Sequence, residues 1–167
     1  MDVCPNGGQL PLYYNHKNTG RPTGGANVFW SHYTDAPNTP LYPFGYGLSY
    51  TTFKYSDIRL SSETIDMGGE LKVTVGLTNI GKRAGAEVVQ LYVRDLVGSV
   101  TRPVKELKGF QKIKLNPGQT QEVTFTLTSQ DLAFYTLNGK WEAEPGRFKV
   151  WVGTNSEEAK ESEFTLR

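Results

Sequence analysis

Apolar and polar residues alternate with a period of two in several short segments after residue 51, and this alternation constrains the fold more than any other feature. Each segment would place its apolar side chains on one face of a β-strand. Residues 53–60 and 104–115 predict two less regular strands. Alternation of this kind is typical of sheets with one buried face. The regular sets are Leu71, Val73, Val75 and Leu77; Val89, Leu91 and Val93; Val123, Phe125 and Leu127; Phe148, Val150 and Val152; and Phe164 and Leu166.

Turn-forming sequences separate these segments at intervals of about ten residues. They are residues 79–82 (NIGK), 116–119 (NPGQ) and 138–139 (NG), while residues 128–132 (TSQDL) predict a single capped helical turn. About seven strands without a long helix between them indicate an all-β fold, a β-sandwich of immunoglobulin or fibronectin type III size. Cys4 is the one cysteine, so the Cys–Trp–Cys pattern of antibody domains is missing, which favours the fibronectin-like variant.

Residues 1–47 differ from the rest of the chain because they are rich in proline and glycine and keep no period. Only residues 9–14 (QLPLYY) could form a short strand. Eleven aromatic residues lie between Tyr13 and Tyr55, a density at which rings pack against a partner surface. We therefore expect residues 1–47 to form an irregular, aromatic-rich linker segment before a sandwich domain of residues 48–167, with part of the partner surface outside this chain.

Composition argues against several classes of function. The net charge is +1, from 18 basic and 17 acidic residues, which gives no electrostatic reason to expect nucleic acid or an anionic membrane as partner. No apolar stretch approaches the length of a membrane span. The first ten residues, MDVCPNGGQL, lack the charged and apolar regions of a signal peptide, so we predict no export signal in this chain.

Catalytic and metal-binding patterns are weak. Glu142 and Glu144 would share a face of an extended segment, as a glycosidic acid pair would require, but a solvated strand edge explains them better. His16 and His32 stand in different loops, and no set of three or four ligands has metal-site spacing. Neither a Gly-x-Ser-x-Gly motif nor a phosphate-binding loop is present. We predict no catalytic residue, no metal and no cofactor.

One loop has the composition of a sugar site. Trp30 and Tyr33 supply aromatic faces on which sugar C–H groups stack, and His32 and Asp35 supply hydrogen-bonding groups for sugar hydroxyls. The same rings could instead attach the loop to a neighbouring domain. We therefore name Trp30, His32, Tyr33 and Asp35 as candidate substrate-binding residues and leave both interpretations open.

Several motifs resemble the C-terminal end of glycoside hydrolase family 3, in the order in which that family has them. They are residues 11–22 (PLYYNHKNTGRP), 41–53 (LYPFGYGLSYTTF), 76–93 (GLTNIGKRAGAEVVQLYV), 102–135 (RPVKELKGFQKIKLNPGQTQEVTFTLTSQDLAFY) and 144–156 (EPGRFKVWVGTNS). The resemblance is greatest to the bacterial periplasmic β-glucosidases, with β-xylosidases nearby, and extends from about Gln9 to the end of the chain.

The resemblance implies a domain order of barrel, α/β domain, linker and fibronectin type III-like domain, with the catalytic carboxylates upstream of the matched motifs. Residues 1–47 would then be the end of the α/β domain plus the interdomain linker, and residues 48–167 the fibronectin type III-like domain. The implied function is a non-catalytic module that stabilises upstream catalytic domains and borders the sugar site. The implied ligand is a β-linked oligosaccharide, and the implied location is periplasmic or secreted.

An alternative function is a free-standing carbohydrate-binding β-sandwich. It requires an exposed aromatic platform on the sandwich itself, for which Trp141 and Trp151 are the candidates. Trp151 alternates with Val150 and Val152, so its side chain should point away from the core.

Overall fold

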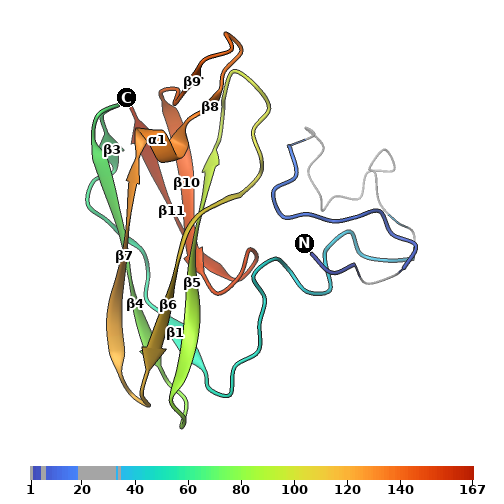
Figure 1. Ribbon diagram of the computed structural model, residues 1–167, viewed down its shortest axis with the longest axis vertical. Coiled ribbons are helices and arrows are strands. Elements are labelled where there is room, and N and C mark those ends of the chain that lie inside the picture. Colours follow the sequence, from blue (N-terminus) through green and yellow to red (C-terminus); the bar gives the residue numbers. More distant parts are fainter. Residues whose placement is uncertain (1, 5–6, 19–32, 34) are drawn as a thin grey trace.

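The computed structural model describes residues 2–4, 7–18, 33 and 35–167, and most of its strands form two packed β-sheets (Figure 1). The first sheet is centred on β4, which pairs along one edge with β7 and along the other with β1 and β2. All of these pairs are antiparallel. Their bounds are Phe53–Tyr55 (β1), Arg59–Leu60 (β2), Glu70–Asn79 (β4) and Thr120–Thr128 (β7).

The second sheet has five strands in the order β3-β11-β10-β5-β6 and is antiparallel except for the β3–β11 pair. Its strands are Thr64–Ile65 (β3), Gly85–Asp95 (β5), Glu106–Leu115 (β6), Gly146–Gly153 (β10) and Ala159–Leu166 (β11). One helical turn, α1 (Ser129–Leu132), and a small hairpin lie at one end of the sandwich; the hairpin pairs β8 (Phe134–Tyr135) with β9 (Trp141–Glu142).

The core lies between the two sheets, and the alternating residues build it. Every residue of the five regular sets named above is buried. Phe148 of β10 and Phe164 of β11 stack with their ring centroids 5.3 Å apart. The prediction of an all-β sandwich is therefore confirmed, because each strand delivers its apolar face to one shared core.

Two strands differ most in extent from the sequence prediction. The segment 53–60 is divided into β1 and β2 by Ser56, whose side-chain oxygen accepts a hydrogen bond from Gly76 N at 2.8 Å. Strand β11 begins at Ala159 rather than near residue 163, because its first residues pair with the end of β10. The predicted helical turn is present as α1, and the Asp131 carboxylate accepts from both the backbone N–H and the hydroxyl of Thr128.

The expected strand at residues 9–14 is wrong, since the structure has no strand there. Pro11 has no N–H to donate to a ladder, and the Leu10 N–H donates to the Tyr33 hydroxyl at 2.8 Å instead. Every named strand of the described chain falls between Phe53 and Leu166. The division at residue 47 remains a prediction.

Candidate functional site

Residues 2–4 and 7–18 lie beside the sandwich together with residues 35–46, on the side of β5 and β6 (Figure 1). Backbone contacts join this N-terminal segment to the loop before β6, where Val104 N donates to the His16 carbonyl at 2.9 Å. The segment is also tied to itself, because Phe44 N donates to the buried Asp2 carboxylate at 2.6 Å. The segment is thus fastened to the outer face of the five-stranded sheet.

Three aromatic rings form the centre of this contact. Tyr14 stacks on Phe44 with a centroid separation of 4.3 Å and meets Tyr92 of β5 edge-on at 5.7 Å. Tyr92 is fully buried although it points away from the sandwich core. Burial raises the pKa of the Tyr92 hydroxyl, with Tyr14 and Asp2 adding to the effect. Sequence alternation alone did not identify Tyr92, because its cover comes from a distant part of the chain.

Gln90 connects the segment to the turn between β10 and β11. Its Nε2 donates to the Gly45 carbonyl at 3.2 Å and to the Thr154 carbonyl at 2.6 Å. Its Oε1 accepts from the Tyr92 hydroxyl at 2.5 Å. Ser156 N donates to the Phe44 carbonyl at 2.9 Å. One buried amide therefore satisfies groups on three separate stretches of chain, which fixes their relative positions.

Lys105 lies beside Tyr92 and Trp151 on the outer face of the five-stranded sheet. Its ammonium lies 4.6 Å from the Trp151 ring centroid and donates to the Ser156 carbonyl. Burial lowers the pKa of Lys105, although Glu157 and Glu161 oppose that effect. Trp151 points away from the core as predicted, but it is partly covered and its Nε1 donates to Glu161 at 3.1 Å. This ring is therefore not an open platform.

The N-terminal segment and the stretch that follows it also present exposed apolar side chains. Leu48 and Tyr50 are 90% and 92% exposed, far more than large apolar residues that serve a core. Others along the segment are 42–76% exposed: Val3, Leu10, Tyr13, Leu41, Tyr42 and Tyr46. We call this set, with Leu48 and Tyr50, the linker surface. A surface of this kind marks an interaction site.

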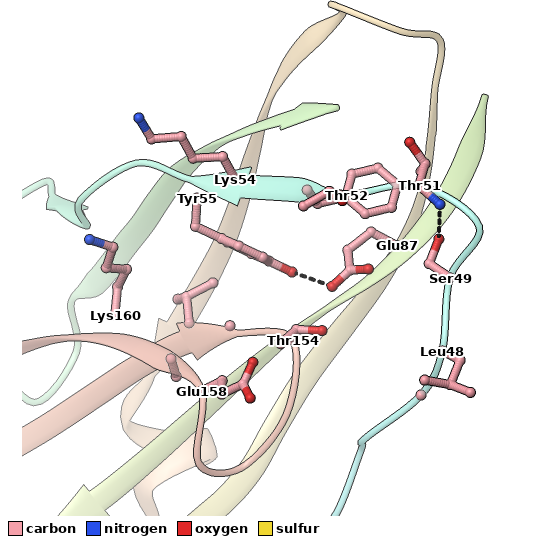
Figure 2. A pocket seen from close by; sticks show the side chains of 15 residues that line it. Leu48, Ser49, Thr51, Thr52, Lys54, Tyr55, Glu87, Thr154, Glu158 and Lys160 are labelled. Atoms are coloured by element: carbon pink, nitrogen blue, oxygen red, sulfur yellow. Dashed lines mark hydrogen bonds between the residues drawn. The ribbon is translucent and has the colours of Figure 1, made fainter. Parts of the chain in front are cut away.

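A groove of about 610 Å³ borders the linker surface (Figure 2). Leu48 and Ser49 line it on one side, and Thr154 and Glu158 of the β10–β11 turn line it on the other. Its size lies within the range of ligand pockets. Its lining mixes hydroxyl, carboxylate, amine and aromatic groups, so it can receive a polar ligand or the side chains of another domain.

Glu87 and Tyr55 form a polar pair in this groove. The Tyr55 hydroxyl donates to Glu87 Oε1 at 2.9 Å and so links the two sheets (Figure 2). Burial, followed by the negative charge of Glu87, raises the pKa of the Tyr55 hydroxyl. The Tyr55 hydroxyl therefore keeps its proton, and its hydrogen bond to Glu87 is a fixed link between the sheets.

The predicted substrate-binding residues are only partly described. Trp30 and His32 lie outside the described residues. Tyr33 accepts from Leu10 N through its hydroxyl, and its own N–H donates to Asn38 Oδ1 at 3.2 Å. Asp35 is exposed two residues further on. Their role in binding substrate remains a prediction.

The two glutamates considered as an acid pair have different surroundings. Glu144 accepts a hydrogen bond from Ser99 N at 2.7 Å, and Glu142 is exposed on β9. Ala143, between them, is buried. In the part of the chain that the structure describes, no three His, Cys, Asp or Glu residues gather as metal ligands. No helix among the described residues is long and apolar enough to cross a membrane.

Comparison with known proteins agrees with this architecture. The family model of the fibronectin type III-like domain matches residues 87–156. The periplasmic β-glucosidase of Salmonella typhimurium is 49% identical over 161 residues, which cover 95% of this chain and 21% of that protein. A β-xylosidase of Formosa agariphila is 48% identical over 124 residues, which cover 74% of this chain and 17% of that protein.

A solved structure has the same fold. The crystal structure of a β-glucosidase from Listeria innocua in complex with glucose matches with a TM-score of 0.89 and 44% sequence identity. The match covers 95% of this chain and 22% of that one. The chain thus spans about a fifth of the length of the relatives that it matches. It corresponds to the C-terminal part of the glycoside hydrolase family 3 β-glucosidases and β-xylosidases, and it contains a fibronectin type III-like domain.

Proposed function

We propose that this chain is the non-catalytic C-terminal module of a β-glucosidase- or β-xylosidase-type glycoside hydrolase and that it stabilises the catalytic domains upstream of it. One observation carries the proposal. The N-terminal segment is fastened to the sandwich by Tyr14, Phe44 and Gln90, whereas the linker surface beyond that contact is exposed. The segment therefore acts as a joint, with one side attached to the sandwich and the other available to a second domain.

The groove beside Leu48 strengthens this interpretation. Exposed apolar side chains next to a concave surface are the usual anatomy of an interface between domains. The relatives are about five times longer than the matched region, so they contain the additional domains that such a surface needs. The Salmonella relative is named as periplasmic, and we propose the same compartment for the parent of this chain.

We propose further that the loop containing Tyr33 and Asp35 borders the sugar site of the parent enzyme. Tyr33 is held by Leu10 and Asn38, so the end of this loop has a defined position. Asp35 is exposed beside it and has the chemistry to accept hydrogen bonds from sugar hydroxyls.

A chimera tests the stabilising role. The matched C-terminal fifth of the Salmonella β-glucosidase would be replaced by this chain, and hydrolysis of nitrophenyl β-glucoside would be compared with that of the truncated enzyme. We expect the chimera to be active and the truncated enzyme to be inactive or unstable. A chimera no better than the truncated enzyme would overturn the proposal.

Two variants of the chimera test the surface itself. Replacing Leu48 and Tyr50 by serine should lower the temperature at which the chimera loses activity, because both side chains would be covered in the assembled enzyme. Val97→Ser is the matched control, since Val97 is 81% exposed but lies beyond the end of β5, outside the linker surface. Purified alone, the 167-residue chain should show no turnover; activity that survives repurification would contradict the non-catalytic role and direct attention to Glu142 and Glu144.

A further inference from the structure

A second exposed apolar surface lies at the end of the sandwich opposite β1, around the β8–β9 hairpin (Figure 1). We call it the hairpin patch. Its members are 58–81% exposed and belong to the hairpin or to the loop after β5: Val97, Tyr135, Leu137 and Trp141. It is separate from the linker surface, and the stabilising role proposed above gives it no function.

The hairpin patch is held in a fixed shape. Tyr135 and Trp141 face each other across the β8–β9 pair, and their rings meet edge to face with a centroid separation of 5.0 Å. Thr136 N donates to the Lys140 carbonyl at 2.9 Å, and Gly139 adopts the left-handed conformation that the turn requires, with φ of 71°. Leu137 N donates to Ser99 Oγ at 3.1 Å, which joins the hairpin to the neighbouring loop.

Buried residues support the hairpin from below. Phe134, which precedes Tyr135 in β8, is buried, and the Arg102 guanidinium lies 4.0 Å from the centroid of its ring. Because the strands, the turn and the supporting ring are all fixed, Tyr135 and Trp141 would lose little freedom on binding. Preorganisation of this kind raises the affinity of a small contact surface.

The size and chemistry of the hairpin patch indicate the ligand. The four side chains provide on the order of a few hundred Å² of exposed apolar surface, whereas a stable protein interface buries about 800 Å² of accessible surface on each partner. A narrow ligand that stacks on one or two rings fits better. The Tyr135 hydroxyl and the Trp141 indole N–H are carried by the rings themselves and can bond sugar hydroxyls. Apolar ring faces flanked by such groups are complementary to sugars, whose C–H faces stack while their hydroxyls hydrogen-bond.

We infer that the hairpin patch is a contact site for a β-linked oligosaccharide, with Trp141 as the stacking residue and Tyr135 as its supporting partner. The choice of a β-linked sugar rests on the proposed function, whereas the location rests on the hairpin alone. Trp151 is not a competing platform, because Lys105 and Glu161 already engage its ring. The site would retain substrate chains near the parent enzyme and is distinct from the loop of Tyr33 and Asp35.

Calorimetric titration of the full 167-residue chain with cellohexaose and with laminarihexaose tests the inference. We expect saturable binding of at least one of them with a Kd of about 0.1–1 mM, and we expect Trp141→Ala to raise that Kd by about tenfold or more. Phe110→Ala is the matched control, since Phe110 is 68% exposed on β6, away from the hairpin, and binding should be unchanged. Circular dichroism verifies that both variants are folded.

Absence of saturable binding by the wild-type chain would overturn the inference, as would binding that Trp141→Ala leaves intact. Sedimentation of the wild-type chain provides a further check. Self-association that is lost in Trp141→Ala would mean that the hairpin patch binds a second copy instead of a sugar. These measurements do not involve the catalytic domains, so their failure is distinguishable from failure of the chimera, which tests the proposed function.

Discussion

Gly45 and Gln90 approach each other so closely that a methyl group on Gly45 would lie 2.1 Å from the Gln90 side-chain oxygen. Gly45 also has a φ of 82°, in the region that favours glycine. The close approach allows the Gln90 amide to reach both the Gly45 and Thr154 carbonyls. The contact between the N-terminal segment and the sandwich therefore depends on the absence of a side chain at position 45.

Gly45→Ala should weaken the contact between the N-terminal segment and the sandwich. The left-handed backbone alone costs a non-glycine residue about 1–2 kcal/mol, and the clash displaces Gln90 from its three partners. We expect the amide of Ser156, which donates to the Phe44 carbonyl across this contact, to exchange with solvent faster. Hydrogen-exchange mass spectrometry measures this directly.

Gly47→Ala is the control for that experiment. A methyl group there would meet no atom within 4 Å, and the backbone of Gly47 is not left-handed. Its effect on the free energy of unfolding should stay within about 0.5 kcal/mol. Equal exchange rates in the two alanine variants would show that Gly45 and Gln90 do not control the joint.

The core of the fold could be predicted from local pattern, but the joint could not. Alternation placed Val89, Leu91 and Val93 of β5 toward the core, where they are buried. The same rule places Gln90 and Tyr92 on the opposite face of β5. Tyr92 is covered by Tyr14, and Gln90 bonds to Gly45 and Thr154. All three partners are far away in sequence, and no local periodicity encodes such contacts.

The high density of aromatic residues in residues 1–47 supported a second, less specific prediction, and part of it is correct. It predicted that the rings pack against a surface, and Tyr14 and Phe44 do so, on the sandwich itself. Leu48 and Tyr50 remain exposed, in keeping with a partner surface outside the chain. The Tyr55–Glu87 pair had no sequence signal, because residues 32 positions apart meet only once the two sheets pack.

Tyr14→Ala should loosen the N-terminal segment without unfolding the sandwich. The ring loses a stack on Phe44 and an edge contact with Tyr92, each worth about 0.5–1.5 kcal/mol beyond area burial. We expect faster tryptic cleavage after Lys17, whose backbone pairs with Pro103 in the intact joint. Tyr13→Ala is the matched control, because Tyr13 is 55% exposed; cleavage as fast as in Tyr14→Ala would contradict the role of Tyr14.

Deleting residues 1–47 should leave a folded sandwich. All members of the buried core cluster lie after residue 64, so the deletion leaves the core intact and removes only the contacts of the N-terminal segment with the outer face, among them those at Tyr92, Gln90, Val104 and Ser156. Circular dichroism should keep its β-sheet signal and show cooperative melting. Deleting residues 1–55 instead should destabilise the sandwich by about 2 kcal/mol or more, because Phe53 and Tyr55 of β1 pack against the core. An unfolded 48–167 fragment would show that the proposed boundary is misplaced.

Asp95→Asn should change the pH dependence of stability. Burial raises the pKa of Asp95 above its ordinary value of 3.8, and the Val97 N–H and Arg102 only partly oppose this. The folded state then binds more protons than the unfolded state just above pH 3.8, so the wild-type chain loses stability as pH rises through that window. Asparagine keeps an oxygen for the Val97 N–H but carries no charge. The variant should therefore gain stability relative to the wild-type chain as pH rises.

Asp57→Asn provides a control of opposite sign. The hydrogen bond and charge of Lys160 lower the pKa of the exposed Asp57, so its contribution is present above pH 3.8 and is lost as pH falls through the lowered pKa. This variant should lose stability relative to the wild-type chain as pH rises. Urea unfolding between about pH 3 and 7 measures both differences. If Asp95→Asn instead loses stability relative to the wild-type chain as pH rises, the buried carboxylate of Asp95 does not destabilise the fold as the structure indicates.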